Sequence, residues 1–377
     1  MALEKIREGM AQIDAYPIAA KDLSKHARVF YNPVMLHNRD ISVLALSVFQ
    51  EETKRTLKVA DCLAATGMRG IRYALEVPGV SDVYFSDMNP EAIRLIKKNV
   101  KLNKIKGAHI EEKDANVLLS EHKYEMDFVD IDPFGTPVQF LDSAARAVSN
   151  KGMLGITATD TAPLSGTYRR AAIRKYGAVS LRCDMQHEIG IRILIANIAR
   201  ECAKYDKGFV PLLSVSELHY FRVFGRIKKT KSAAEENIEN VGYLAYCTSC
   251  GFREFKKDKC AETCPECAKK LSFPGPLWTG NIFDADFCGK VAEKSHAMKD
   301  GALVKLLDTI SEESEISGFF YDLGMLSSIL KIPPPRINDI IEKLKKEGFL
   351  ASRTHFLLTG LRTDAKITDL KKILAEL

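Results

Sequence analysis

Short apolar runs alternate with helical patterns of apolar residues between about Leu57 and Ile156. This alternation is typical of an α/β domain built on a parallel sheet. Residues 209–224 are again rich in strand-forming side chains and should complete the sheet. The expected strands span residues 57–63, 82–87, 109–112, 126–131 and 152–159, and the expected helices span residues 90–102, 138–149, 167–175 and 189–204.

The pattern changes near residue 230. Residues 230–240 are polar and charged, which predicts a linker. We expect a domain boundary between residues 240 and 241, because three helical patterns and a hairpin-like stretch follow in the order of a winged helix. These patterns cover residues 302–311, 321–330, 335–346 and 348–358.

Length and composition indicate a globular protein with more than one domain. The chain has 377 residues, 46% of them hydrophobic and 28% charged. No apolar run approaches the ~18 to 20 residues of a membrane span, and the first ten residues carry charges where a signal peptide would be apolar. We therefore expect a cytoplasmic protein without a membrane partner.

Basic residues gather in a few places although the formal net charge is only +6. Such gathering favours a polyanionic partner, while a solvated face is the simpler alternative for any one group. The groups are Arg169-Arg170 with Arg174-Lys175, residues 226–231, Lys256-Lys257 with Lys259, and Lys269-Lys270.

The clearest chemical signal is Asp130-Ile131-Asp132-Pro133-Phe134-Gly135, directly after the apolar run 126–129. Open α/β sheets bind ligands at such strand ends. The side chain of Asp132 and the carbonyl of Pro133 can accept both hydrogens of a planar exocyclic amine, while the ring of Phe134 stacks on a nucleobase. An ordinary Asp-Pro turn is the alternative interpretation.

A cofactor site is expected beside this segment. The small-residue turn Ala64–Gly70 leads into a helix, and Gly67 lets backbone amides approach a carboxylate or phosphate. Asp87 ends the second expected strand, where an acid can bind both ribose hydroxyls, and Asp114-Ala115 end the third, beside an adenine. NAD and S-adenosylmethionine both satisfy these features, and helix capping is the alternative role for such aspartates. The amine clamp at Asp132 favours methyl transfer, because hydride transfer has no use for it.

Nine cysteines in such a chain argue for metal ligation or buried thiols rather than disulfides. Cys247 and Cys250, then Cys264 and Cys267, form two Cys-x₂-Cys pairs separated by 13 residues. Four thiolates suit a tetrahedral Zn²⁺ with no open position, which is a structural zinc ribbon. Cys260 is a competing ligand whose spacing makes no second pair. The basic residues between the pairs, Arg253 among them, are expected to contact phosphates.

The whole chain resembles the tRNA guanine-26 N2-dimethyltransferases of archaeal type, a family of class I S-adenosylmethionine-dependent methyltransferases. The resemblance implies a Rossmann-like class I methyltransferase sheet with an N-terminal extension over residues 1–240. It also implies a C-terminal α+β, tRNA-binding domain over residues 241–377, with the zinc ribbon near 243–273 and the winged-helix-like segment near 300–360. The segments that carry the resemblance are residues 29–35, 38–40, 66–70, 86–90, 130–135, 168–170 and 188–192, followed by the cysteine pairs.

The resemblance also implies roles for individual residues. Arg39 and Arg69 would engage the cofactor at its carboxylate, with Gly67 in the turn, Asp87 on the ribose and Asp114 and Ala115 at the adenine. Phe30 and Phe134 would face the target guanine. The implied reaction transfers one and then a second methyl to N2 of guanosine 26, with tRNA as the partner and no protein partner implied.

Guanine N2 is a poor nucleophile because its lone pair is delocalised into the ring. Hydrogen bonds to Asp132 and Pro133 would draw the nitrogen toward sp³ geometry and aim it at the methyl group. Asp130 either passes the proton on or is a structural carboxylate. Phe140 is a weaker stacking candidate than Phe134, because an aromatic residue in such a domain usually belongs to the core.

Three other functions remain open at this point. A nucleic-acid-binding regulator would use the zinc ribbon and winged helix, with the α/β domain as a ligand sensor. An NAD-linked oxidoreductase would need a proton donor near the nicotinamide and gives no reason for the ribbon. A methyltransferase acting on another RNA guanine would keep the same site.

Overall fold

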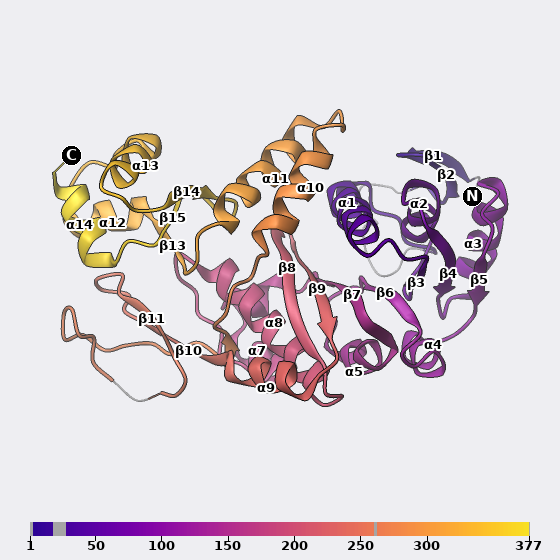
Figure 1. Ribbon diagram of the computed structural model, residues 1–377, viewed down its shortest axis with the longest axis horizontal. Helices are drawn as coiled ribbons and strands as arrows, with labels where there is room; N and C mark the ends of the chain where they lie inside the picture. Colours follow the sequence, from indigo (N-terminus) through magenta and orange to yellow (C-terminus); the bar gives the residue numbers. More distant parts are fainter. Residues whose placement is uncertain (1–2, 18–27, 260–261, 377) are drawn as a thin grey trace. The chain divides into compact units, whose positions relative to one another are not determined.

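The computed structural model describes residues 3–17, 28–259 and 262–376. Its main sheet has seven strands in the order β5-β4-β3-β6-β7-β9-β8 (Figure 1). The first five strands of this order pair in parallel, whereas β8 and β9 are joined by a two-residue turn and make the sheet mixed. The expected α/β class is therefore confirmed. The strands are β3 (Leu57–Asp61), β4 (Val80–Ser86), β5 (Ala108–Glu111), β6 (Met126–Ile131), β7 (Val148–Ala158), β8 (Gly208–Glu217) and β9 (Tyr220–Lys228).

Helices connect the parallel strands as the sequence pattern predicts. Helix α3 begins at Pro90, the favoured first position, and the side chain of Asn89 caps it by accepting a hydrogen bond from the Glu91 amide. Helix α5 ends at Ala147, two residues earlier than expected, because Val148 already belongs to β7. The helices around these strands are α1 (Leu36–Thr53), α2 (Met68–Glu76), α3 (Pro90–Leu102), α4 (Ala115–Glu121), α5 (Val138–Ala147), α6 (Thr161–Leu164), α7 (Arg169–Tyr176) and α8 (Gln186–Ala203), with a 3₁₀ turn at Pro33–Met35.

Two expectations from the sequence are wrong. The linker expected over residues 230–240 is helix α9 (Lys231–Glu239), because Ala233, Ala234 and Asn237 form one buried face. The helix expected from Tyr321 begins only at Leu323, since Phe320–Asp322 form strand β13 and Asp322 caps helix α12. The sequence pattern did not predict the N-terminal hairpin of β1 (Glu4–Glu8) and β2 (Ala11–Ala15).

The remaining elements form two small sheets and the helices around them. One sheet has the order β11-β10-β12 and the other β13-β15-β14, with all their pairs antiparallel. The elements are β10 (Val241–Tyr246), β11 (Arg253–Lys256), β12 (Leu277–Trp278), α10 (Ala285–Ser295), α11 (Gly301–Ser314), β13 (Phe320–Asp322), α12 (Leu323–Leu330), α13 (Ile337–Lys346), β14 (Ala351–Thr354), β15 (Leu357–Thr363) and α14 (Ile367–Ala375).

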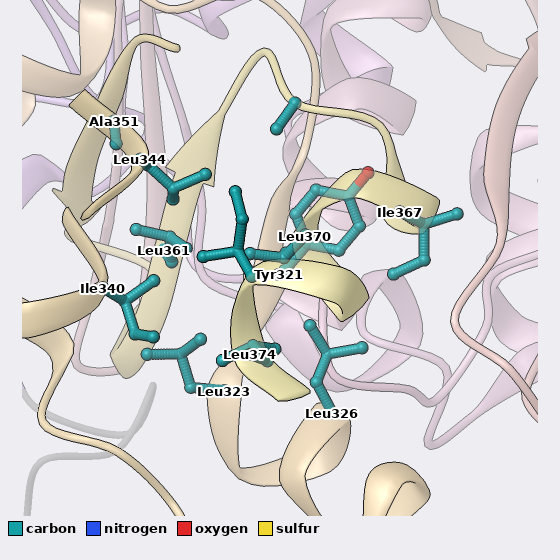
Figure 2. Packing of buried hydrophobic residues seen from close by; sticks show 12 residues of the cluster. Tyr321, Leu323, Leu326, Ile340, Leu344, Ala351, Leu361, Ile367, Leu370 and Leu374 are labelled. Carbon is teal, nitrogen blue, oxygen red and sulfur yellow. The ribbon is translucent and has the colours of Figure 1, made fainter. Parts of the chain in front are cut away.

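A separate apolar core holds the last of these elements together. Figure 2 shows Leu323, Leu344, Leu361 and Leu370 among the buried side chains of this core. They come from α12, α13, β15 and α14, so the three helices and the three-stranded sheet share one apolar core. Helix α14 was not foreseen, yet its Leu370 and Leu374 are fully buried.

By its internal contacts the chain forms two compact units that are interleaved in sequence. Unit 1 comprises residues 1–158, 201–210 and 224–234, and unit 2 comprises residues 159–200, 211–223 and 235–377. The functional boundary at residues 240–241 stays a prediction. In the part of the chain that the structure describes, no helix is both long and apolar enough to cross a membrane.

A buried ion network stabilises unit 2. Glu313 on α11 accepts a 2.8 Å hydrogen bond from Nε of Arg362 on β15 and a 2.6 Å bond from the Thr354 hydroxyl. The second carboxylate oxygen of Glu313 accepts bonds from the backbone amide and Nδ1 of His355. Arg362 also donates to Glu188 on α8 at 2.9 Å. The network thereby ties α8 to α11 and β15.

Candidate active site at the acidic edge of the sheet

Aspartates gather where the parallel strands of unit 1 end. Asp61 on β3 lies in register with Asp130 on β6, and both side chains are buried. Asp132 follows β6 directly, and its side chain is 23% exposed. Because parallel strands end at one edge, the sequence places these carboxylates together. Asp132 alone of the three is open to a ligand from solvent.

Arg69 in the first turn of α2 lies at the centre of this group. Its guanidinium donates to the Asn38 side-chain oxygen at 2.7 Å and to the Ser42 hydroxyl at 2.9 Å. It also forms an ion pair with Oδ2 of Asp132 and lies 3.7 Å from Oδ2 of Asp130. The structure therefore brings Arg69 onto the proposed catalytic carboxylate, a contact that sequence reasoning missed.

The two buried aspartates differ in their partners. The Tyr73 hydroxyl donates to Asp130, whereas Asp61 accepts a 2.9 Å bond from the Gly70 amide. Burial and the neighbouring charge of Asp130 raise the pKa of Asp61 to about 7, although Arg69 opposes the shift. Asp61 was not among the expected site residues. Its position at a strand end, opposite Asp130 in a parallel sheet, was the signal that could have found it.

Phe134 presents an unusually exposed aromatic ring beside Asp132. The residue is 57% exposed, and its ring meets Phe30 edge to face at a centroid distance of 4.2 Å. Two aromatic rings left partly uncovered offer a flat apolar guest a place to stack. Pro133 is buried and directs the chain out of the strand. Phe140 is 6% exposed and belongs to the core, as its weaker ranking anticipated.

The expected cofactor residues lie along the same edge and have local partners. Both oxygens of Asp87 accept backbone hydrogen bonds at 2.9 Å, from the amides of Ala65 and Asn89. Asp114 caps α4 through a 2.8 Å bond from the Asn116 amide to Oδ1, and Ala115 is the first, buried residue of that helix. Gly67 has a φ of +77°, a conformation that glycine adopts without strain. These contacts order the loops that a cofactor would meet.

Arg39 binds the N-terminal hairpin. Its guanidinium binds Glu8 of β1 through two hydrogen bonds of 2.5 and 2.7 Å and donates to the Asn32 carbonyl at 3.0 Å. The Tyr31 hydroxyl donates to the same Glu8 at 2.5 Å. Arg39 is 7% exposed, and among the described residues it shares no hydrogen-bond partner with Arg69. Its role at the cofactor stays a prediction.

Four cysteines in unit 2 converge as expected. The sulfur atoms of Cys247, Cys250, Cys264 and Cys267 all lie within 4.8 Å of one another. Tetrahedral Zn²⁺ with Zn–S bonds of about 2.3 Å requires sulfur separations of about 3.8 Å, so the cluster fits a zinc ion. Each Cys-x₂-Cys turn closes by a 2.9 Å bond to the carbonyl of its first cysteine, from Gly251 and Ala268 respectively. Cys260 lies outside the described residues.

Arg253 does not reach phosphates as the sequence suggested. Its side chain is 2% exposed and forms a 3.0 Å ion pair with Asp184, which also accepts a 2.6 Å bond from the Tyr246 hydroxyl. Its guanidinium stacks on the Tyr321 ring with a centroid distance of 4.2 Å. Arg253 therefore ties the cysteine module to β13 of the C-terminal core.

The parallel strands of the sheet carry a glycine turn after β3 and acids at the ends of β3, β4 and β6. This arrangement is typical of α/β enzymes that bind nucleotide cofactors. Comparison with known proteins specifies the family. Residues 9–375 match the family model for N2,N2-dimethylguanosine tRNA methyltransferase. A tRNA (guanine(26)-N(2))-dimethyltransferase from Methanosphaera stadtmanae is 39% identical over 99% of this chain and 96% of its own length.

Other relatives agree. A tRNA (guanine(26)-N(2)/guanine(27)-N(2))-dimethyltransferase from Aquifex aeolicus is 38% identical over 100% of this chain and 96% of its own length. The structure of Trm1 from Pyrococcus horikoshii with S-adenosyl-L-methionine matches with a TM-score of 0.87 and 35% identity, covering 98% of this chain and 99% of the other. The chain therefore belongs to the N2,N2-dimethylguanosine tRNA methyltransferase family. The regulator and oxidoreductase hypotheses have no such support.

Proposed function

We propose that the chain transfers methyl groups from S-adenosylmethionine to the exocyclic N2 of guanosine 26 in tRNA, first to N2-methylguanosine and then to N2,N2-dimethylguanosine. The observation that carries the proposal is the oriented carboxylate of Asp132, held by Arg69 beside the exposed ring of Phe134. Family membership supports methyl transfer to guanine N2, and the aspartates at the edge of the sheet support the location of the active site there.

S-adenosylmethionine fits this edge on one specific observation. The Asn38 side chain is fully buried, and its Nδ2 atom has no hydrogen-bond partner among the described residues. Its oxygen is fixed by Arg69, so an amide donor and a guanidinium lie side by side and suit a carboxylate. Asp87 would hold the ribose and Asp114 with Ala115 the adenine, with Gly67 in the approaching loop and Arg39 as a further cofactor contact. When bound, the cofactor supplies an electrophilic methyl group.

The residues of the chain would then prepare the amine. Arg69 pairs with Oδ2 of Asp132, and Oδ1 would accept one N2–H bond. The Pro133 carbonyl accepts the other, since a carbonyl oxygen has two lone pairs. Both bonds strengthen as positive charge develops on the nitrogen. The proton released from the ammonium passes to Asp132 and on to solvent, because this side chain is partly exposed. Asp130, bonded by Tyr73, positions Arg69 from the buried side.

The aromatic pair would hold the base. Guanine N2 lies within a stacked base of folded RNA, so access requires extrusion of the nucleotide, which costs a few kcal/mol. Stacking on Phe134, with Phe30 supporting the ring from its edge, would replace the lost contacts.

The C-terminal part would bind the tRNA. We propose a structural Zn²⁺ held by the four cysteines as a zinc ribbon, and a winged helix formed by α11, α12, α13 and the β14–β15 hairpin. The order of these elements and the sheet order β13-β15-β14 support the winged helix. The zinc would stabilise the fold and leave no open position for catalysis.

Substitution of Asp132 tests the proposal. Asp132→Ala and Asp132→Asn should lower kcat for methylation of an unmodified tRNA by about 10²- to 10³-fold, because a charged transition-state acceptor is lost. Affinity for S-adenosylmethionine should be unchanged. Asp206→Asn is the control, an exposed aspartate in the turn before β8 of the same unit. Full activity of Asp132→Ala would refute the mechanism.

A further inference from the structure

The segment between Asp160 and Asp184 in unit 2 is basic and contains no acidic residue. Residues 161–183 include Arg169, Arg170, Arg174, Lys175 and Arg182. The two aspartates that flank the segment already form ion pairs with other residues: Asp160 binds Lys175 at 2.9 Å, and Asp184 binds Arg253 at 3.0 Å. Four arginines therefore remain without a neighbouring acid in the sequence.

Helix α7 directs these charges outward. Its inner residues Ala172 and Tyr176 are buried, and the Tyr176 hydroxyl donates to Asp160 at 2.5 Å. Arg170 and Arg174 are exposed on the other side, and Arg169 is exposed as the first residue of the helix. The helix is thus anchored by one face, and its arginines are held on a rigid element rather than on a loop.

The fourth arginine joins the same surface through a close backbone approach. Gly166 has a φ of +88°, and a Cβ atom there would lie 2.4 Å from the Arg182 nitrogen. Only glycine permits this approach, which places the exposed Arg182 beside the segment that leads into α7. The Ser180 hydroxyl donates to the Pro163 carbonyl at 2.7 Å and links the segment after α7 to helix α6.

Some exposed cations of the chain are neutralised by a nearby carboxylate. Arg94, Lys204 and Lys290 are each exposed by 42% or more, and each pairs within 3.0 Å with a carboxylate three or four residues earlier in the sequence. Among the described residues, the structure records no ion pair for Arg169, Arg170, Arg174 or Arg182. Unneutralised guanidinium groups at one surface suit phosphates, which their planar fork binds through two hydrogen bonds.

An aromatic ring accompanies the charges. Tyr168, directly before α7, is 62% exposed, and Ile173 between the arginines is 48% exposed. Interleaved arginine and exposed aromatic residues are the pattern of RNA-contacting surfaces, where the charges follow the backbone and the ring stacks on an unpaired base. An anionic lipid surface offers phosphates but no base for such a ring.

We infer that Tyr168, Arg169, Arg170, Arg174 and Arg182 form a second tRNA-contacting surface, made of residues other than those of the zinc ribbon and winged helix. The arginines bind phosphates of the sugar-phosphate backbone, and Tyr168 stacks on an unpaired base. The identity of the RNA rests on the proposed function. The surface gives affinity and position, whereas the chemistry stays with Asp132.

Salt dependence of tRNA binding tests the surface. The full-length variant Arg169→Gln/Arg170→Gln/Arg174→Gln keeps helix propensity but removes three charges. Its matched control, Arg94→Gln/Lys204→Gln/Lys290→Gln, removes three charges that are already paired. The dissociation constant for an unmodified tRNA transcript is measured from roughly 0.05 to 0.2 M salt, and thermal unfolding of each variant confirms that it folds.

The surface variant should bind tRNA about 10- to 100-fold more weakly at about 0.1 M salt, and its slope of log Kd against log salt should fall by about 2 to 3. The control should retain the wild-type slope. Tyr168→Ala should weaken binding without changing the slope, and Tyr168→Phe should restore it. A wild-type slope and affinity in the surface variant, or an equal loss in the control, would overturn the inference.

Two further outcomes separate this inference from the proposed function. If the wild type methylates tRNA while the surface variant binds tRNA normally, the inferred tRNA-contacting surface is wrong and the proposed function stands. If the wild type neither binds nor methylates tRNA but binds vesicles of anionic phospholipid through these arginines, both proposals fail.

Discussion

Replacement of Glu313 by glutamine should strongly destabilise unit 2. This carboxylate is fully buried and accepts hydrogen bonds from Arg362, Thr354 and His355. Glutamine has nearly the same shape but only one acceptor oxygen and no charge. The substitution therefore leaves the guanidinium of Arg362 with Glu188 as its only carboxylate partner.

The magnitude follows from the environment of the carboxylate. Burial alone would raise the pKa of Glu313, but the neighbouring His355 and Arg362 outweigh it and lower the pKa from its ordinary 4.5 to about 2. This difference corresponds to roughly 3 kcal/mol of folding free energy at neutral pH. Removal of one partner from a buried ion pair costs about 3 to 5 kcal/mol in other proteins, which agrees with this value.

Because the folded pKa lies below the unfolded one, the stabilisation is present above about pH 4.5 and is lost as the pH falls toward 2. Thermal and urea unfolding of the full chain should show Glu313→Gln less stable by about 3 to 5 kcal/mol at pH 7. The wild type should lose this advantage between about pH 4.5 and 2. Glu312→Gln, an exposed neighbour on the same helix, is the control. A loss below about 1 kcal/mol, or an equal loss in the control, would refute the reasoning.

Three further predictions concern other parts of the chain. Asp61 keeps its proton up to about pH 7 in the folded state, whereas the unfolded state releases it near pH 3.8. The free energy of unfolding should therefore fall as the pH rises between these two values. Asp61→Asn should remove that fall in urea titrations at several pH values. Gly70→Ala would place a Cβ atom 2.3 Å from Cε1 of Phe85 and should cost about 1 to 3 kcal/mol, whereas an unchanged melting temperature would contradict this packing. Purified protein should contain about one zinc per chain by atomic absorption, and Cys264→Ser should lower both the zinc content and the melting temperature. Metal-free protein of full stability would exclude the structural role.

Much of the fold was predictable because local patterns and tertiary packing agree. Strand β6 and helix α3 have the bounds that apolar runs and the Asn89-Pro90 start indicated. Helix α9 was missed because its sequence is mostly polar, and only packing of Ala233 and Ala234 shows that one face is covered. Composition alone cannot distinguish such a helix from a linker.

The candidate site was predictable at strand ends and in the cysteine pairs, where chemistry follows spacing. Contacts between distant segments were not. The ion pair of Arg69 with Asp132 joins residues 63 positions apart, and Arg39 meets Glu8 from a hairpin that no pattern announced. Arg253 is a residue type that often binds phosphate, yet its guanidinium is buried and pairs with Asp184, 69 residues away. Charge in a sequence does not reveal which carboxylate neutralises it.

The central claim is that this chain forms N2,N2-dimethylguanosine at position 26 of tRNA through Asp132. Its most direct test is nucleoside mass spectrometry of an unmodified tRNA transcript incubated with S-adenosylmethionine and either the wild type or Asp132→Ala, with transcripts carrying adenosine at position 26 or at position 27 as controls. The account predicts N2-methylguanosine and then N2,N2-dimethylguanosine with the wild type, loss of both when guanosine 26 is replaced, and no more than trace product with Asp132→Ala. Methylation of a transcript lacking guanosine 26, or undiminished product from Asp132→Ala, would contradict it.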